Sequence, residues 1–265
     1  MLYMEISLAT RLPASPVPEY ARISIAGETA GSPVFDDVYF SDAGGYLESE
    51  HVFIRGNRLP ERLSAGGSSE FVIGETGFGT GRNLLVLMKL LRELGAQGCI
   101  LPDIHFITME KYPLRPEDLR SAQGIFRNLS REAGLFQECY RIAGTGIQTM
   151  IPEPGLTVHL IVGDVLDICP ALRLSRPVNA WFLDGFAPSR NPDMWSLPVM
   201  RELFRMSAPG TTLATYTVSG TARRNLNAAG FATAKIPGFG RKREMMVGEV
   251  FETVQPGKEY LRVVP

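Results

Sequence analysis

The sequence has little cysteine, little histidine and no long apolar run, and each shortage excludes a class of protein. Its three cysteines, Cys99, Cys139 and Cys169, stand far apart, so they predict neither a disulfide framework nor a CxxC metal site. Free thiols are typical of a reducing compartment, so we expect a cytoplasmic location. The three histidines show no spacing of metal ligands, and we expect no metal. No apolar run approaches the roughly 20 residues of a membrane-spanning helix, so no membrane partner is expected.

The N-terminus and the composition exclude two further possibilities. Residues 1–20 contain charged residues and prolines but no long apolar segment, so no secretory signal is expected. A hydrophobic content of 45% with a net charge of −1 is ordinary for a folded protein and excludes global disorder. The 265 residues suit one large domain, or one domain with an N-terminal decoration.

The small net charge conceals a segregation of charge along the chain. Residues 176–243 contain ten Lys and Arg but three Asp and Glu, so this stretch carries +7 and the remainder −8. Segregated positive charge is compatible with a nucleic-acid partner, and a solvated basic face would show the same pattern. Charge alone leaves both interpretations open.

From residue 70 onward, strand-like apolar runs alternate with segments of helical period. The apolar runs lie at 71–73, 104–107, 158–162, 180–183 and 212–217, and two strands joined by a turn at 238–243 are predicted at the end, over 231–251. This alternation predicts an α/β fold with a mostly parallel sheet, covered by helices on both faces. Such sheets bind ligands beyond the carboxyl ends of their strands.

Residues 1–69 lack a helical period. Their short apolar runs, Val38–Phe40 and Val52–Ile54, are separated by glycines and acidic residues, which indicates short strands and turns. We therefore predict two parts, a β-rich decoration or lid over residues 1–69 and the main domain over residues 70–265.

The sharpest motif is the glycine-rich segment Glu75–Gly81, ETGFGTG, which follows an apolar strand and opens an amphipathic helix. Glycines let a backbone turn tightly and approach a ligand closely, although a purely structural turn would use them as well. A phosphate-binding loop needs Gly-Lys-Ser/Thr, which is absent, and a dinucleotide fingerprint needs Gly or Ala where Arg82 stands. The remaining pattern resembles the first motif of Rossmann-like methyltransferases that use S-adenosylmethionine (AdoMet).

That resemblance implies an AdoMet site at the strand ends. Glu110, after the second strand, would accept the ribose hydroxyls, and Asp164, after the third, would accept the adenine amino group. One acid at a strand end is more often a helix cap, but three such acids in order behind the glycine motif, with Asp184 as the third, favour a cofactor site. The residues predicted to bind AdoMet are Glu75, Gly77, Phe78, Gly79, Gly81, Glu110 and Asp164.

The segment Asp184–Pro188, DGFAP, follows the fourth strand. It occupies the place of the Asp/Asn-Pro-Pro-aromatic loop with which amine-directed methyltransferases hold an NH₂ group. Asp184 is therefore the predicted catalytic residue, and we favour an orienting role over proton removal.

Four longer motifs make the resemblance specific: FDDVYFS (35–41), ETGFGTGRN (75–83), WFLDGFAPSRNPDMW (181–195) and GFGRKREM (238–245). They resemble the methyltransferase half of the bifunctional bacterial MnmC family and its stand-alone versions. The resemblance implies methyl transfer from AdoMet to the exocyclic amine of 5-aminomethyl-2-thiouridine at the tRNA wobble position, giving 5-methylaminomethyl-2-thiouridine. No dinucleotide fingerprint is present, so we expect no oxidase step and no FAD.

The implied partner is the anticodon stem-loop of tRNA, and not DNA. The N-terminal acids would attract the aminomethyl cation, Phe186 would stack on the base, and basic residues would contact phosphates. The residues predicted to contact the substrate are Asp36, Asp37, Tyr39, Phe186, Arg223, Arg224, Arg241, Lys242 and Arg243. A solvated acidic surface and a structural turn at 241–243, paired with local carboxylates, are the alternatives. Trp195 is expected to pack in the core.

Three other functions share parts of this pattern. A methyltransferase of another amine would use the same cofactor site but would not need the +7 stretch. A non-catalytic tRNA-binding module would not need the intact glycine motif or Asp184. A Rossmann oxidoreductase is disfavoured by Arg82.

Overall fold

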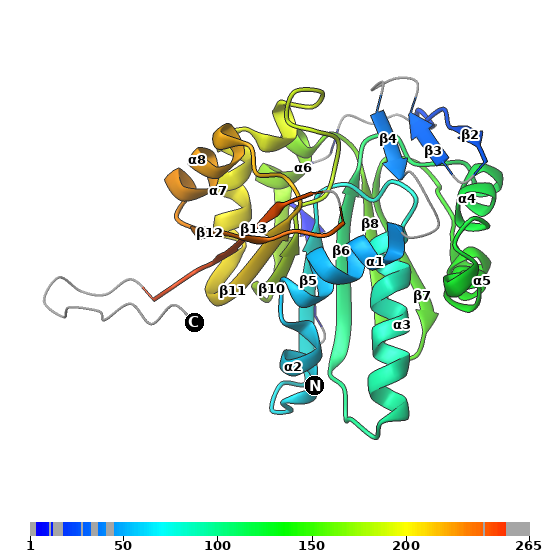
Figure 1. The fold of residues 1–265 in the computed structure, drawn as a ribbon, viewed down its shortest axis with the longest axis horizontal. Helices are drawn as coiled ribbons and strands as arrows, with labels where there is room; N and C mark the ends of the chain where they lie inside the picture. The colour runs from blue at the N-terminus through cyan, green and yellow to red at the C-terminus, as the bar shows by residue number, and fades with distance from the viewer. Residues whose placement is uncertain are drawn as a thin grey trace, which may run out of the picture.

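An eight-stranded sheet forms the centre of the protein in this computed structural model, which describes residues 4–10, 12, 18–27, 29–32, 37–40, 45–240 and 242–252 (Figure 1). The strand order is β12-β13-β11-β10-β5-β6-β8-β7. Neighbours from β11 to β8 pair in parallel. These strands are β5 (Glu70–Glu75), β6 (Asp103–Glu110), β8 (Leu156–Val162), β10 (Val178–Phe182) and β11 (Ser207–Thr215). The predicted, mostly parallel sheet is confirmed.

The outer strands pair antiparallel. The predicted terminal hairpin is present as β12 (Ala232–Pro237) and β13 (Glu244–Glu249), and it joins the sheet at β11. At the other edge, β7 (Gly146–Glu153) pairs with β8. The sequence does not predict β7, because most of its residues remain partly or fully exposed and its apolar residues form no continuous run.

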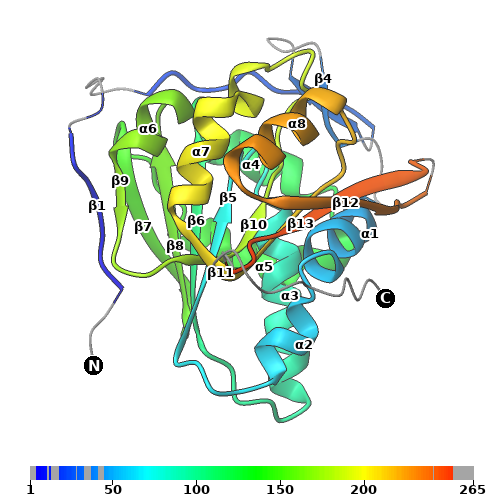
Figure 2. The same ribbon diagram turned by 90° about the vertical axis from the view of Figure 1, so that its left-hand side faces the viewer.

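Helices cover both faces of the sheet, as predicted (Figures 1 and 2). One face carries α3 (Arg82–Ala96), α4 (Pro116–Gln123), the short η2 (Arg127–Leu129) and α5 (Ser130–Cys139), which pack into one apolar cluster. The other face carries α6 (Val165–Ala171), η3 (Asp193–Trp195), α7 (Leu197–Arg205) and α8 (Gly220–Ala229), which pack into a second. The apolar stripe of α3 is buried, and the run 82–88 is buried on every side because neighbouring helices also contact α3.

Residues 45–64 are helical, which corrects the prediction of strands and turns there. They form α1 (Gly45–Ser49), the π-helical turn η1 (Glu50–Arg55) and α2 (Leu59–Ser64). Val52–Ile54 is almost fully buried in the same apolar cluster as α3. The prediction was wrong because a short apolar run does not by itself distinguish a strand from a buried helical turn.

The segment before these helices is β-rich, as predicted. β1 (Ile6–Leu8) pairs antiparallel with β9 (Leu172–Leu174). A separate antiparallel sheet of β2 (Ser24–Ala26), β3 (Thr29–Ser32) and β4 (Asp37–Phe40) lies near the carboxyl edge of the main sheet, at the top of Figures 1 and 2. A boundary at residue 69 and a role as a lid stay predictions.

Two further findings concern the described residues as a group. Within them, no helix combines the length and the apolar character that crossing a membrane requires. Nor do three or more His, Cys, Asp or Glu side chains gather there in a group that could hold a metal ion. Cys99, Cys139 and Cys169 are free thiols.

Gly74 shows how tightly the centre of the sheet is packed. It pairs with Trp181 across β5 and β10, and an added Cβ would lie 2.2 Å from the indole Cζ3. We expect Gly74→Ala to lower the free energy of unfolding by roughly 1–3 kcal/mol or more through overpacking, as measured by denaturant titration. Gly95→Ala in α3 is the control, because nothing lies within 4 Å of its added Cβ. It should stabilise by roughly 0.5–1 kcal/mol, and equal stabilities of the two variants would contradict this packing.

Candidate active site

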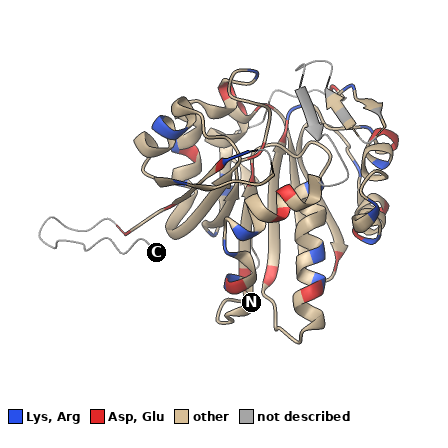
Figure 3. Ribbon diagram, viewed as in Figure 1, with Lys and Arg blue, Asp and Glu red and all other residues tan. Residues whose placement is uncertain are grey.

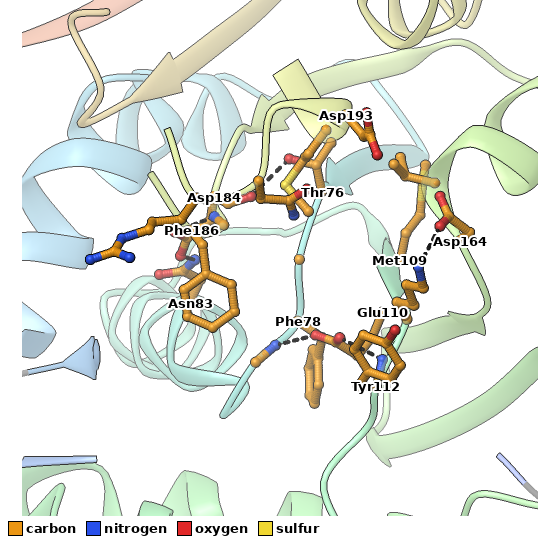
Figure 4. A pocket seen from close by; sticks show the side chains of 18 of the residues that line it. Thr76, Phe78, Asn83, Met109, Glu110, Tyr112, Asp164, Asp184, Phe186 and Asp193 are labelled. Carbon is orange, nitrogen blue, oxygen red and sulfur yellow. Dashed lines mark hydrogen bonds and ion pairs between the residues drawn. The ribbon is translucent and has the colours of Figure 1, made fainter. Parts of the chain in front are cut away.

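A pocket opens at the carboxyl edge of the parallel strands, where such sheets bind ligands (Figure 4). Its cavity volume is about 320 Å³, which lies in the usual range of small-molecule sites, roughly 300–1,000 Å³. The lining residues follow the ends of β5, β6, β8, β10 and β11: 76–80, 82–83, 109–112, 163–165, 184–186, 190–194 and Tyr216.

The glycine turn after β5 forms one wall. Gly77, Gly79 and Gly81 have φ angles of 146°, 53° and 72°, which residues other than glycine rarely adopt. Phe78 is 4% exposed and its ring packs on Phe136, 5.6 Å between centroids. An added Cβ at Gly81 would lie 2.6 Å from the Phe78 ring. Gly77, Phe78 and Gly79 therefore line the pocket, while Gly81 lies outside the lining and supports Phe78.

Glu110, at the end of β6, holds the glycine turn in place. Its Oε2 accepts the backbone N–H of Gly79 at 2.9 Å, and its Oε1 accepts that of Tyr112 at 2.9 Å. Burial raises the pKa of Glu110, and these backbone donors oppose that rise. Glu110 lines the pocket, so its carboxylate lies where the sequence predicts a ribose contact.

Asp164 is a helix cap and a pocket residue at once. Its Oδ1 accepts the N–H of Leu166 at 2.9 Å at the start of α6, and its Oδ2 pairs with Lys111 Nζ at 2.8 Å. Burial alone would raise the pKa of Asp164, but the bonds from Lys111 and Leu166 outweigh it and lower that pKa. A role as a helix cap and a position in the predicted cofactor pocket are therefore compatible for Asp164.

Asp184 faces the pocket from the loop after β10 (Figure 4). Its Oδ1 accepts the N–H of Gly185 and its Oδ2 accepts Asn83 Nδ2, each at 2.7 Å. The hydroxyl of Thr76 donates to the Asp184 carbonyl at 3.0 Å. Gly185 has a φ of 142°, and an added Cβ would lie 2.3 Å from Met194 Sδ. The carboxylate is thus held in one orientation by Asn83 and by the backbone N–H of Gly185.

Glu75 lies behind the pocket rather than on its wall. It is 1% exposed and lies outside the pocket lining. Its Oε1 accepts Asn83 Nδ2 at 2.9 Å and its Oε2 accepts the Thr108 hydroxyl at 2.7 Å. Burial, and next the charge of Asp184, raise the pKa of Glu75 well above its ordinary value.

The aromatic residues divide between wall and core. Phe186 is half-buried on the pocket wall, and its carbonyl accepts Trp195 Nε1 at 3.1 Å. Trp195 is 2% exposed in an apolar cluster, so the prediction of core packing is confirmed. Tyr216 lines the pocket and donates its hydroxyl to the Gly185 carbonyl at 2.7 Å. Burial, and next the charge of Asp184, raise the pKa of Tyr216 well above its ordinary value, so this residue stays a neutral phenol.

The described basic residues of 176–243 are spread over several elements, and Figure 3 shows the described charged residues of the chain. Among the described residues, ion pairs join Arg176 to Glu70, Arg205 to Glu202, Lys235 to Glu244 and Lys242 to Glu48. Three of these acids, Glu48, Glu70 and Glu244, lie outside the stretch, so they partly neutralise its +7.

The predicted phosphate contacts differ in their surroundings. Arg223 and Arg224 are exposed on α8, and Arg243 is exposed before β13. Lys242 pairs with Glu48 at 2.8 Å, and its Nζ lies 3.9 Å from the centroid of the Tyr216 ring, beside the pocket. Glu48 belongs to α1, so the carboxylate that pairs with Lys242 comes from a distant segment of the chain and not from the turn itself.

The remaining predicted substrate residues lie in the N-terminal segment before α1 or in the turn between β12 and β13. Asp37 and Tyr39 lie in β4. Asp36 and Arg241 lie outside the described residues.

Several polar residues of the pocket were not predicted as site residues from the sequence, among them Asn83, Lys111, Tyr112, Asp193 and Tyr216. Asn83 follows the glycine motif in the first turn of α3, and Lys111 and Tyr112 follow Glu110, so their positions beside predicted site residues were an available signal. Asp193 belongs to the motif at 181–195, which was an available signal, whereas Tyr216 reaches the pocket through the fold of a later loop and no local pattern indicates it.

Comparisons with known proteins show which family this chain resembles. A family model described as S-adenosyl-L-methionine-dependent methyltransferase matches residues 130–250. The tRNA 5-methylaminomethyl-2-thiouridine biosynthesis bifunctional protein MnmC of Pseudomonas fluorescens is 43% identical over 238 residues, covering 88% of this chain and 35% of that protein. The MnmC of Vibrio campbellii is 41% identical over 229 residues, covering 83% and 34%. This chain is a homologue of the methyltransferase domain of MnmC.

The resemblance to MnmC predicted from the four motifs is thereby confirmed, and the chain spans about a third of the length of these curated relatives. The crystal structure of MNMC2 from Aquifex aeolicus matches with a TM-score of 0.66 and 22% identity, over 92% of this chain and 75% of that one. At such identity the likeness shows the fold. The predicted Rossmann-like methyltransferase fold is confirmed.

Proposed function

We propose that this protein transfers a methyl group from AdoMet to the exocyclic amine of 5-aminomethyl-2-thiouridine at the tRNA wobble position, giving 5-methylaminomethyl-2-thiouridine. The observation that carries the proposal is one cavity bordered both by the glycine turn with Glu110 and by the oriented carboxylate of Asp184. The homology to MnmC, whose name states a role in making this tRNA nucleoside, supports the choice of substrate.

The residues on the wall suit AdoMet. Gly77 and Gly79 leave the backbone of the turn uncovered by side chains, which allows close approach of a ligand. Glu110 would accept the ribose hydroxyls and Asp164 the adenine amino group, since ionised carboxylates are acceptors only. When bound, AdoMet supplies an activated methyl group.

The acceptor amine must be neutral to attack, because an ammonium has no lone pair. A free alkylamine has a pKa near that of Lys, about 10.4, and removal from water lowers it. The Asp184 carboxylate attracts the cation, the ammonium releases one proton to the solvent, and the carboxylate then accepts a hydrogen bond from the neutral amine, which orients the nitrogen lone pair. Such a reaction is accelerated mainly by positioning. Phe186, on the same wall, would stack on the extruded base, and an anticodon loop presents that base at low unstacking cost.

Nucleoside mass spectrometry tests the proposal. The purified protein is incubated with AdoMet and with tRNA from a strain lacking this gene, which should carry 5-aminomethyl-2-thiouridine. We expect that nucleoside to gain one methyl group. A protein that binds AdoMet by calorimetry yet leaves the nucleoside unchanged would overturn the substrate assignment. A cytoplasmic location and contact with the anticodon stem-loop accompany this proposal.

The salt dependence of tRNA binding should report the phosphate contacts of α8. Arg223 and Arg224 are exposed there, so we expect Arg223→Gln with Arg224→Gln to weaken tRNA binding. The slope of log K against log salt should shrink by roughly 0.7–0.9 for each phosphate that the variant no longer neutralises. Lys235→Gln is the control, because Lys235 already pairs with Glu244 at 2.9 Å. A folded double variant with unchanged affinity and slope would show that the phosphates lie elsewhere.

A further inference from the structure

Asn83 lies at the centre of a buried hydrogen-bond network that joins distant parts of the chain. Its Nδ2 donates to Glu75 Oε1 at 2.9 Å and to Asp184 Oδ2 at 2.7 Å, while its Oδ1 accepts the Ser49 hydroxyl at 2.7 Å. The exposed fractions are 4% for Asn83 and 1% for both Glu75 and Ser49. The network therefore runs from the N-terminal helix α1, through the start of α3, to β5 and to the reacting edge of the pocket.

Only an amide of this length can occupy the position. Its NH₂ group has two donor hydrogens and meets two carboxyl groups, and its oxygen meets a hydroxyl donor, so every polar atom of the side chain has a partner. An aspartate would present oxygens to both carboxyls. A flipped amide would do the same, so the network itself determines which way Asn83 points.

Glu75 is the member of this network that lies behind the pocket wall. It contacts Asn83 and Thr108, and among the described residues no Lys or Arg pairs with it. Glutamine keeps a side-chain oxygen at this position, so it can imitate the acceptor that Asn83 uses while removing the charge of Glu75. A carboxylate that bound the cationic end of a cofactor would instead have to reach the pocket wall, and Glu75 lies outside the lining.

We propose that Asn83 is the positioning residue of Asp184, and that Glu75 acts through Asn83 instead of contacting AdoMet. This inference rests on the proposed function, in which Asp184 orients the acceptor amine. One Asp184 oxygen is held by the N–H of the next residue, which moves with the loop, and the other by Asn83, which is fixed in α3. Asn83 thus fixes one oxygen of the carboxylate relative to the cofactor turn, while the Tyr216 hydroxyl also contacts the Asp184 side chain from the loop after β11.

The first test compares Asn83→Ala and Asn83→Asp with wild type in tRNA methylation. We expect kcat to fall roughly tenfold to hundredfold in both, as for a misplaced reacting group. The AdoMet Kd and the tRNA KM should stay within about twofold of wild type. Asn83→Asp should also move the pH profile of kcat upward, because a third carboxyl beside Asp184 and Glu75 disfavours ionisation. Asn128→Ala, an exposed amide in η2 outside the pocket lining, is the control for the substitution.

The second test uses Glu75. Glu75→Gln keeps an acceptor for Asn83 and should restore most of the turnover that Glu75→Leu loses, since the Thr108 hydroxyl can accept as well as donate. Both variants should bind AdoMet within about twofold of wild type by calorimetry, after circular dichroism has confirmed folding. Asn83 variants with wild-type kcat would overturn the positioning role. A large rise in the AdoMet Kd of Glu75→Gln would show that the Glu75 charge binds the cofactor. This titration needs no tRNA, so it decides the role of Glu75 even if tRNA proves not to be the substrate.

Discussion

Replacement of Asp184 by alanine should reduce methyl transfer by roughly a hundredfold or more, while binding of AdoMet and tRNA is retained. The carboxylate borders the pocket and is held by Asn83 and by the N–H of Gly185, so it offers the substrate amine an acceptor in a defined orientation. Without this carboxylate the amine still binds, but its lone pair is not oriented toward the methyl group. Positioning supplies most of the rate enhancement in such a displacement. Single-turnover methylation of tRNA, with AdoMet affinity measured by calorimetry, separates the chemical step from binding.

Asp184→Asn distinguishes orientation from proton removal. Its amide oxygen can still accept a hydrogen bond from Asn83, but the residue is neutral. Turnover well above that of Asp184→Ala would support the orienting role, and turnover equal to it would assign the charge itself a role. Near-normal single-turnover methylation by Asp184→Ala would show that Asp184 is a structural residue at the end of a strand.

Replacement of Glu110 by alanine should weaken AdoMet binding most among the cofactor residues. Its carboxylate fastens the glycine turn through the N–H of Gly79 and borders the cavity where a ribose contact is predicted. A hydrogen bond to a charged group is worth roughly 1.5–3 kcal/mol. The AdoMet Kd should therefore rise roughly tenfold to hundredfold, as measured by calorimetry.

A matched substitution serves as control for this result. Glu117→Ala removes an exposed carboxylate at the start of α4, outside the pocket lining, and should leave the AdoMet Kd unchanged. If Glu110→Ala titrates with AdoMet like Glu117→Ala, the assignment of the cofactor pocket is wrong.

Features determined by short stretches of chain could be predicted from the sequence alone. The alternation of apolar runs with the helical stripe of α3 predicts the parallel sheet and its two helical layers, because the hydrophobic period of each element is visible in its own short stretch of sequence. The glycine motif likewise predicts a turn from local sequence, since the positive φ angles at Gly77, Gly79 and Gly81 favour glycine. Topology then brings Glu110, Asp164 and the glycine turn to one edge, as predicted.

The tertiary structure alone decided which of these groups meet. Asn83 and Asp184 are 101 residues apart and share a hydrogen bond, and Lys242 pairs with Glu48 of α1. No period or spacing encodes such partners. The same is true of Val52–Ile54, which is a buried helical turn because a neighbouring helix covers it, although its composition suits a strand equally well. Glu75 illustrates the physical reason: its place in the motif is local information, but whether its carboxyl faces a ligand or the core depends on the packing of α3 against the sheet.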